Sequence, residues 1–212
     1  MLRSLVGSEM CIRDRYMVIY EYPFNELVRS LLRLEYLFDR FYYHVEKDDA
    51  RDMHQAISII LDLGEVTARA DLKSSLMKEL DRQKSSLEAL KNQAGINQKL
   101  LDSTLKDMNA IWQKINGTVG KSNALITDSE WLNTIRTRLS VPGGTSPVDL
   151  PSYHAWQFIA PEKRRAALKA YVTPLEPWSE ASSMFLRLLR ESGQAVKTVA
   201  PQGAYQQMLS GK

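Results

Sequence analysis

The chain has 212 residues, of which 44% are hydrophobic and 25% charged, so it is long enough for one domain with a sizeable core. Its 28 Lys and Arg against 25 Asp and Glu give a net charge of +3, which is too small to indicate a nucleic-acid partner by itself. No apolar run approaches the roughly 20 residues that cross a bilayer. The single cysteine, Cys11, excludes an internal disulfide framework and is compatible with a reducing cytosol.

Residues 1–16 differ in character from the rest of the chain. They show no sustained hydrophobic period, and they lack the apolar core and the small-residue cleavage site of a signal peptide. The stretch SEMCIRDRY at residues 8–16 closely resembles a translated sequencing-adaptor scar. We therefore expect residues 1–16 to be a non-native, disordered tail; the alternative is a disordered native tail.

A short strand and a long helix are predicted next. Residues 18–22 are β-branched and aromatic and are followed by Pro23, a pattern typical of a strand. From Asn25 a helical period places apolar side chains on one broad face: Phe24, Leu27, Val28, Leu31, Leu34, Phe38 and Phe41. Arginines 29, 33 and 40 fall together on the opposite face. Glu35 lies at the edge of the apolar face, so we expect it to need a cationic partner from elsewhere.

Two heptad-patterned segments follow a second predicted helix over residues 50–63. Their apolar seams are spaced by alternating steps of four and three residues: Leu76, Leu80, Gln83, Leu87, Leu90 and Ala94, then Leu101, Leu105, Met108, Trp112 and Ile115. The Ala94-Gly95 pair separates them, so they predict an antiparallel helical hairpin over residues 71–115. Gln83, a polar residue in the seam, is expected to fix the register.

The second half of the chain predicts further helices. A capping box at residues 127–130, with Thr127 as the cap, predicts a helix that ends before Pro142. Pro161 and Pro177 stand where prolines open helices, and Gly193 stands where the last helix ends. Residues 196–199 and 204–208 are possible strands. So little β-structure does not stand alone, which leads us to expect that the natural protein continues past residue 212.

No catalytic or metal-binding constellation is found. Residues 120–122 read Gly-Lys-Ser, but a phosphate-binding loop requires a glycine where Ile115 stands. The histidines are isolated, and no paired-cysteine or His-Glu-x-x-His spacing exists. The basic run at residues 163–165 is interpreted as a solvated helix face. We therefore predict that the protein is not an enzyme and uses no metal or cofactor.

Four segments together resemble the ZapD family, the Z-ring-associated protein D of bacterial cell division. They read YEYPFNE at residues 20–26, running on to RLE at 33–35, then MKELDRQ at 77–83, IRTRLSVPGG at 135–144 and DLPSYHAW at 149–156. They occur in the family's order and roughly its spacing, and the resemblance extends from residue 18 to about residue 209. Each string is modest alone, but together they are specific.

The resemblance implies a mainly α (α+β) fold: a helical bundle over residues 23–193 and a small β-domain. That β-domain would be formed by an N-terminal strand at 17–22 and C-terminal strands at 194–212, the latter truncated here. Family members are cytoplasmic homodimers that bind the C-terminal tail of the tubulin-like protein FtsZ. They cross-link its filaments into bundles at the midcell Z-ring, with no membrane insertion. The resemblance thus implies a non-enzymatic cell-division factor.

The FtsZ tail is a short peptide with acidic and apolar residues, so its receptor should combine arginines with an apolar shelf. On this basis we expect the tail-binding basic surface to comprise Arg33, Arg69, Arg136, Arg138 and His154. An internal ion pair of Arg33 and Arg138 with Glu35 is the structural alternative.

Two other functions are weighed. A helical nucleic-acid-binding protein would use the basic helix faces, but aromatics are not interleaved with the basic residues as stacking platforms require. A nucleotide-dependent regulator or enzyme would use the loop at residues 120–122. The function of a filament cross-linker is favoured over both, and we expect no nucleic-acid partner.

Overall fold

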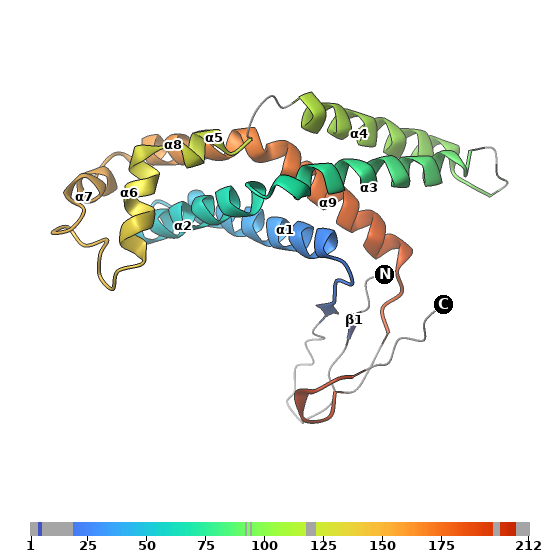
Figure 1. Ribbon diagram of the computed structural model, residues 1–212, viewed down its shortest axis with the longest axis horizontal. Helices are drawn as coiled ribbons and strands as arrows, with labels where there is room; N and C mark the ends of the chain where they lie inside the picture. The colour runs from blue at the N-terminus through green and yellow to red at the C-terminus, as the bar shows by residue number, and fades with distance from the viewer. Residues whose placement is uncertain are drawn as a thin grey trace.

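A computed structural model describes residues 4–5, 19–91, 93, 95–117, 122–196 and 200–206. The fold is mainly helical, as predicted (Figure 1). The helices are α1 (Glu26–Val45), α2 (Ala50–Thr67), α3 (Ala70–Glu88), α4 (Gln98–Gly117), α5 (Ala124–Thr127), α6 (Glu130–Leu139), α7 (Pro151–Gln157), α8 (Pro161–Val172) and α9 (Glu176–Ser192). Short 3-10 turns are η1 (Thr173–Leu175) and η2 (Pro201–Gly203), and the strands are β1 (Ser4–Leu5) and β2 (Tyr20–Glu21).

Helix α1 is the centre of the fold. Asn25 caps it, because the side-chain oxygen of Asn25 accepts a hydrogen bond of 2.7 Å from the backbone N–H of Val28. Leu31, Leu34 and Phe41 on its apolar face are fully buried, and α1 packs against α2 and α9 (Figure 1). Burial of this face, rather than helix propensity alone, holds α1 in place. Phe24 precedes the cap and is 49% exposed, so its predicted place in the apolar face is wrong.

The predicted helical hairpin forms in α3 and α4, which pack on each other and extend away from α1 and α2 (Figure 1). Helix α3 ends at Glu88, so the prediction is wrong in carrying its helical seam on to Leu90, and residue 94 lies outside the described residues. Gly95, in the connection, has a φ of +89°, a conformation that favours glycine. Leu76, Leu80 and Leu105 are buried in the seam, so the heptad pattern forms internal core. The amide of Gln83 donates to Glu79 in its own helix at 3.1 Å, and its predicted role in register stays a prediction.

The start of α6 differs from the prediction. Thr127 ends α5, and its N–H donates to the carbonyl of Asn123 at 3.0 Å. The N-cap of α6 is Ser129, whose extended backbone lets its hydroxyl accept from the N–H of Leu132 at 3.2 Å. The prediction of Thr127 as the cap is therefore wrong, because the preceding helical turn already holds its backbone.

The later helices start and end as the prolines and glycine predict. Pro161 and Pro177 lie in the first turns of α8 and α9, and Gly193 follows the last residue of α9. Helix α7 fills a segment for which no helix is predicted. Among the described residues, no helix is both long and apolar enough to cross a membrane.

Strands β1 and β2 pair antiparallel, with Ser4 opposite Glu21 and Leu5 opposite Tyr20. The strand predicted at residues 18–22 is thus confirmed only at Tyr20–Glu21: residues 19 and 22 are described but not in a strand, and residue 18 lies outside the described residues. Most of residues 1–16 lie outside the described residues, so the assignment of a non-native tail stays a prediction, as do the domain boundaries.

The C-terminal strands are confirmed only in small part. Val196 forms a single bridge, and residues 197–199 and 207–208 lie outside the described residues. Residues 204–206 are irregular rather than a strand, since the preceding turn η2, with positive φ at Gln202 and Gly203, redirects the chain.

Candidate functional site

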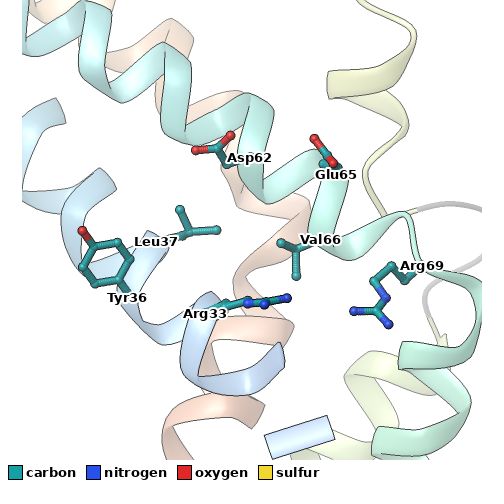
Figure 2. A pocket seen from close by; sticks show the side chains of 7 residues that line it. All are labelled: Arg33, Tyr36, Leu37, Asp62, Glu65, Val66 and Arg69. Carbon is teal, nitrogen blue, oxygen red and sulfur yellow. The ribbon is translucent and has the colours of Figure 1, made fainter. Parts of the chain in front are cut away.

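A shallow pocket of about 470 Å³ lies along the seam between α1 and α2 (Figure 2). We call it the α1–α2 groove. Its lining is Arg33, Tyr36 and Leu37 from α1, and Asp62, Glu65, Val66 and Arg69 from α2 and the turn after it. Tyr36 and Leu37 follow Arg33 by three and four residues, and Glu65 and Val66 follow Asp62 by three and four, which places each set on one side of its helix. Arg69 follows Val66 by three residues, in the turn after α2. The groove therefore combines two guanidinium groups, two carboxylates and apolar surface.

The two arginines of the groove differ in their partners. Arg33 is exposed, and among the described residues it makes no hydrogen bond or ion pair. Arg69 donates from Nη1 to Oε1 of Glu26 at 3.1 Å and lies 3.9 Å from the carboxylate of Asp71. Arg69 is thus held across the junction of α1 and α3, whereas the guanidinium of Arg33 is available to an anionic ligand.

The carboxylates line the α2 side of the groove (Figure 2). Burial raises the pKa of Asp62 above its ordinary value, and the nearby charge of Glu65 raises it further. Arg136 acts in the opposite direction and lowers the pKa of Asp62. Because that effect requires proximity, Arg136 on α6 belongs to the electrostatic surroundings of the groove, although it does not line it.

The structure does not join the other two predicted site residues to the groove. Arg138 lies 3.8 Å from the carboxylate of Asp149 in the loop after α6. The ring of His154 packs edge-on to Phe158, with 5.0 Å between the ring centroids. Within the described chain, neither residue shares a hydrogen bond or ion pair with the groove lining. Their role in one basic surface stays a prediction.

Glu35 finds its cationic partner in a residue that sequence reasoning did not single out. Nη1 and Nη2 of Arg190, on α9, donate to its two oxygens at 2.8 and 2.7 Å. The alternative in which Arg33 and Arg138 pair with Glu35 is therefore wrong. The position of Glu35 at the edge of an apolar face indicates that it needs a cationic partner, but it does not identify which residue that partner is.

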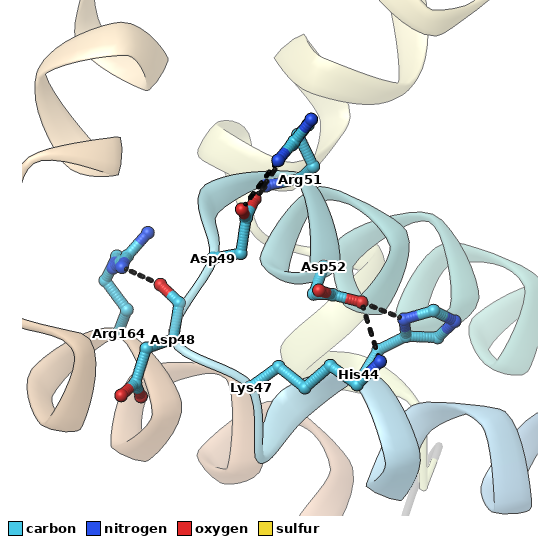
Figure 3. Close-up of polar contacts among 7 residues, drawn as sticks. All are labelled: His44, Lys47, Asp48, Asp49, Arg51, Asp52 and Arg164. Atoms are coloured by element: carbon cyan, nitrogen blue, oxygen red, sulfur yellow. Dashed lines mark hydrogen bonds and ion pairs between the residues drawn. The ribbon is translucent and has the colours of Figure 1, made fainter.

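A second polar cluster lies at the loop between α1 and α2 (Figure 3). Arg164, only 4% exposed, donates from Nη2 to the carbonyl of Asp48 at 2.7 Å. Arg165 donates to the carbonyl of Val45 and to the carboxylate of Asp48. The interpretation of residues 163–165 as a solvated helix face is therefore wrong for these two arginines, which fasten α8 to the loop.

The other polar side chains around that loop form hydrogen bonds or ion pairs with residues close to them in the sequence. Nδ1 of His44 lies 2.7 Å from the carboxylate of Asp52, and Asp49 accepts from the backbone and side chain of Arg51 (Figure 3). In the part of the chain that the structure describes, no group of three or more His, Cys, Asp or Glu could hold a metal ion. These contacts hold the helix ends together and form no reactive constellation.

The Gly-Lys-Ser loop falls mostly outside the described residues. Ser122, its last residue, accepts a hydrogen bond of 3.1 Å from the indole N–H of Trp178. Its hydroxyl therefore joins the loop to α9.

The model of the ZapD family, described as a cell division protein, matches residues 32–212. The match begins in α1 and includes every residue of the groove and all five predicted site residues.

Proposed function

Because the chain belongs to the ZapD family of cell division proteins, we propose that it binds the C-terminal tail of FtsZ in the α1–α2 groove. The proposal is supported mainly by the guanidinium of Arg33, which makes no ion pair with any described residue and lies beside the apolar surface of Leu37 and Val66. An arginine fork can bind a carboxylate through two hydrogen bonds. The adjoining apolar surface would take up the apolar side chains of the same short peptide.

The mixed charge of the groove would set the orientation of the peptide. An acidic group would lie near Arg33 and Arg69 and away from Asp62 and Glu65, because like charges in contact cost free energy. Arg136 lowers the pKa of Asp62 and so favours its charged carboxylate, while adding a positive charge near it. Arg138 and His154 would extend the basic surface along α6 and α7.

The proposed biological activity is the cross-linking of filaments by a homodimer at the midcell division site. A two-fold dimer presents the same groove twice. When each groove binds the tail of a different filament, two weak contacts together cross-link the filaments, since the second contact forms at a high effective concentration. This activity needs no catalysis, and we place the protein among non-enzymatic cytoplasmic division factors.

Co-sedimentation with polymerised FtsZ, with and without its C-terminal tail, tests the proposal. The wild-type chain should pellet and bundle filaments only when the tail is present. Arg33→Glu should abolish this, while Lys106→Glu on the exposed face of α4 makes the same charge change far from the groove and should retain it. Far-UV circular dichroism confirms that both variants are folded.

Pelleting of Arg33→Glu at the wild-type level would refute the groove as the tail-binding site. Pelleting that does not require the tail would refute the partner. Arg138→Glu tests the wider basic surface, and its normal bundling would confine the site to the groove itself.

A further inference from the structure

A stripe of alternating cations and tyrosines runs along α1 from the groove to the end of the helix. Its members are Arg33, Tyr36, Arg40, Tyr43 and Lys47, spaced by three, four, three and four residues. That spacing keeps the four helical members on one side of α1, and Lys47 follows just beyond the end of the helix. Tyr36 and Tyr43 are 58% and 60% exposed. The interpretation that aromatics are not interleaved with basic residues is therefore wrong for this helix, and we call the five residues the α1 stripe.

Two of the three cations of the stripe, Arg40 and Lys47, are held in position by the tyrosines. Nη1 of Arg40 donates to the hydroxyl of Tyr36 at 3.0 Å, and its guanidinium carbon lies 5.4 Å from the centroid of that ring. Nζ of Lys47 lies 3.8 Å from the centroid of the Tyr43 ring. Such contacts restrain long side chains without neutralising them. Less conformational entropy is then lost when an anion binds.

Neighbouring carboxylates leave most of this charge unmatched. Within the described residues, Arg33 and Arg40 make no ion pair, and Lys47 lies 3.7 Å from Asp52. Asp39 is exposed beside the stripe on α1. Within the part of the chain that the structure describes, the stripe therefore offers an anionic ligand two guanidinium groups that make no ion pair and one partly matched ammonium group.

The spacing of the three cations in the stripe indicates what kind of ligand it fits. Arg33 and Arg40 are seven residues apart, about 10 Å along a helix axis, and Lys47 follows seven residues later, just beyond the helix end. An extended or polyproline-type peptide advances roughly 3.1–3.4 Å per residue, so every third residue covers about the same distance. We propose that the α1 stripe binds an extended acidic peptide with a carboxylate at every third position, as a continuation of the α1–α2 groove. The inference rests on the proposed function in taking the filament tail as that peptide.

A peptide suits the stripe better than a single-stranded nucleic acid. Bases bind to such surfaces by stacking on aromatic faces, but a cation already lies over one face of each tyrosine ring. A nucleic acid also carries a negative charge at every nucleotide. Those phosphates would meet Asp39 beside the stripe and Asp62 and Glu65 in the groove, whereas widely spaced carboxylates avoid them.

Fluorescence anisotropy with two labelled synthetic peptides tests the inference. Both have the same composition, with three aspartates either at every third position or adjacent to one another. The full-length protein should bind the spaced peptide about fivefold more tightly. In Arg40→Gln/Lys47→Gln, affinity for the spaced peptide should fall about tenfold, because two charge contacts of under about 1 kcal/mol each are lost.

The control is Lys99→Gln/Lys106→Gln, which removes two exposed lysines of α4 that make no ion pair within the described residues. It should bind the spaced peptide like the wild type. Equal affinity of the wild type for both peptides, or unchanged affinity in the stripe variant, would overturn the proposal. Tighter binding of a thymidine oligonucleotide at the same salt, lost in the stripe variant, would replace the peptide by nucleic acid.

The two proposals can fail separately. If filaments pellet in a tail-dependent way but both peptides bind equally, the stripe is wrong and the groove stands. If filaments do not pellet but the spaced peptide binds through Arg40 and Lys47, the stripe stands and FtsZ is not its source of acidic peptide.

Discussion

Arg190 holds Glu35 in a bidentate ion pair, with hydrogen bonds of 2.8 and 2.7 Å from its two terminal nitrogens. The same guanidinium donates from Nε and Nη2 to Glu21 at 2.7 and 2.8 Å. One side chain of α9 thereby contacts both strand β2 and α1, which are neighbours in the sequence but far from α9 along the chain. The two carboxylates raise the pKa of Arg190 above its ordinary value, which favours the charged guanidinium.

Loss of this arginine should weaken the fold measurably. We expect Arg190→Gln to lower the free energy of unfolding by about 1 kcal/mol, since the geometry is bidentate but the group is partly exposed and screened by solvent. Arg187→Gln on the same helix is the control, because its contact with Glu191 is 4.0 Å long and exposed. Urea denaturation followed by circular dichroism measures both, and an equal loss in the two variants would contradict the account.

The pH dependence of stability should report the same contact. The hydrogen bond from Arg190 is the main cause that lowers the pKa of Glu21 below its ordinary value of 4.5. A carboxyl with a lowered folded pKa stabilises the fold above its unfolded pKa, and this contribution is lost as the pH falls through the folded value. The difference in unfolding free energy between the wild type and Glu21→Gln should therefore be largest at neutral pH and shrink below pH 4.5. A difference that is constant across this range would refute the role of Glu21.

Titration of Asp62 tests whether Arg136 acts on the groove. Removing the positive charge of Arg136 destabilises the carboxylate, so Arg136→Gln should raise the pKa of Asp62 still further above its ordinary value. Arg138→Gln should leave it unchanged, because Arg138 faces Asp149 instead. Side-chain NMR of the two variants gives the answer. A change in the pKa of Asp62 caused by Arg138→Gln would show that Arg138 also acts on the groove.

Much of the helical fold could be predicted because its signals are local. The apolar period of α1 and its Asn25 cap lie within consecutive residues, and the prolines that open α8 and α9 act through their own φ angles. The α6 cap shows the limit of such signals. Thr127 and Ser129 are both capping residue types, and the packing of α5 against α2 and α6 decides between them.

The contacts that complete the site depend on distant residues. Arg190 and Glu35 are 155 positions apart, and nothing in the sequence around Arg190 distinguishes it from an exposed helical arginine. Asp62 and Glu65 were missed because the resemblance pointed to basic residues only. Their spacing with Val66 and Arg69 does indicate one face of a helix, but only the fold shows that this face meets α1.

Arg164 should tolerate an apolar replacement of similar length. Its Nε and Nη1 atoms are buried and have no hydrogen-bond partner among the described residues, and its guanidinium lies 5.9 Å from the centroid of the Trp156 ring. Arg164→Met removes these unsatisfied donors and keeps the packing, so we expect a change within about 1 kcal/mol. Arg164→Ala leaves a cavity and should cost about 2–3 kcal/mol. Chemical denaturation of both variants checks this, and a larger loss in the methionine variant would show that the hydrogen bond to Asp48 dominates.

Gly64 should be constrained by a single neighbour. A Cβ atom at this position of α2 would lie 2.8 Å from Cγ2 of the fully buried Ile126. In the wild-type background, Gly64→Ala should therefore lower the free energy of unfolding by about 1–3 kcal/mol through overpacking. In an Ile126→Ala background the clash is removed, and the same substitution should instead stabilise the protein by about 0.5–1 kcal/mol, because alanine favours the helix. A double-mutant cycle in urea measures this change of sign. If Gly64→Ala destabilised both backgrounds equally, Ile126 would not be the obstacle, and the carbonyl of Gly64, which accepts from the Asn123 amide at 2.7 Å, would be the contact to examine.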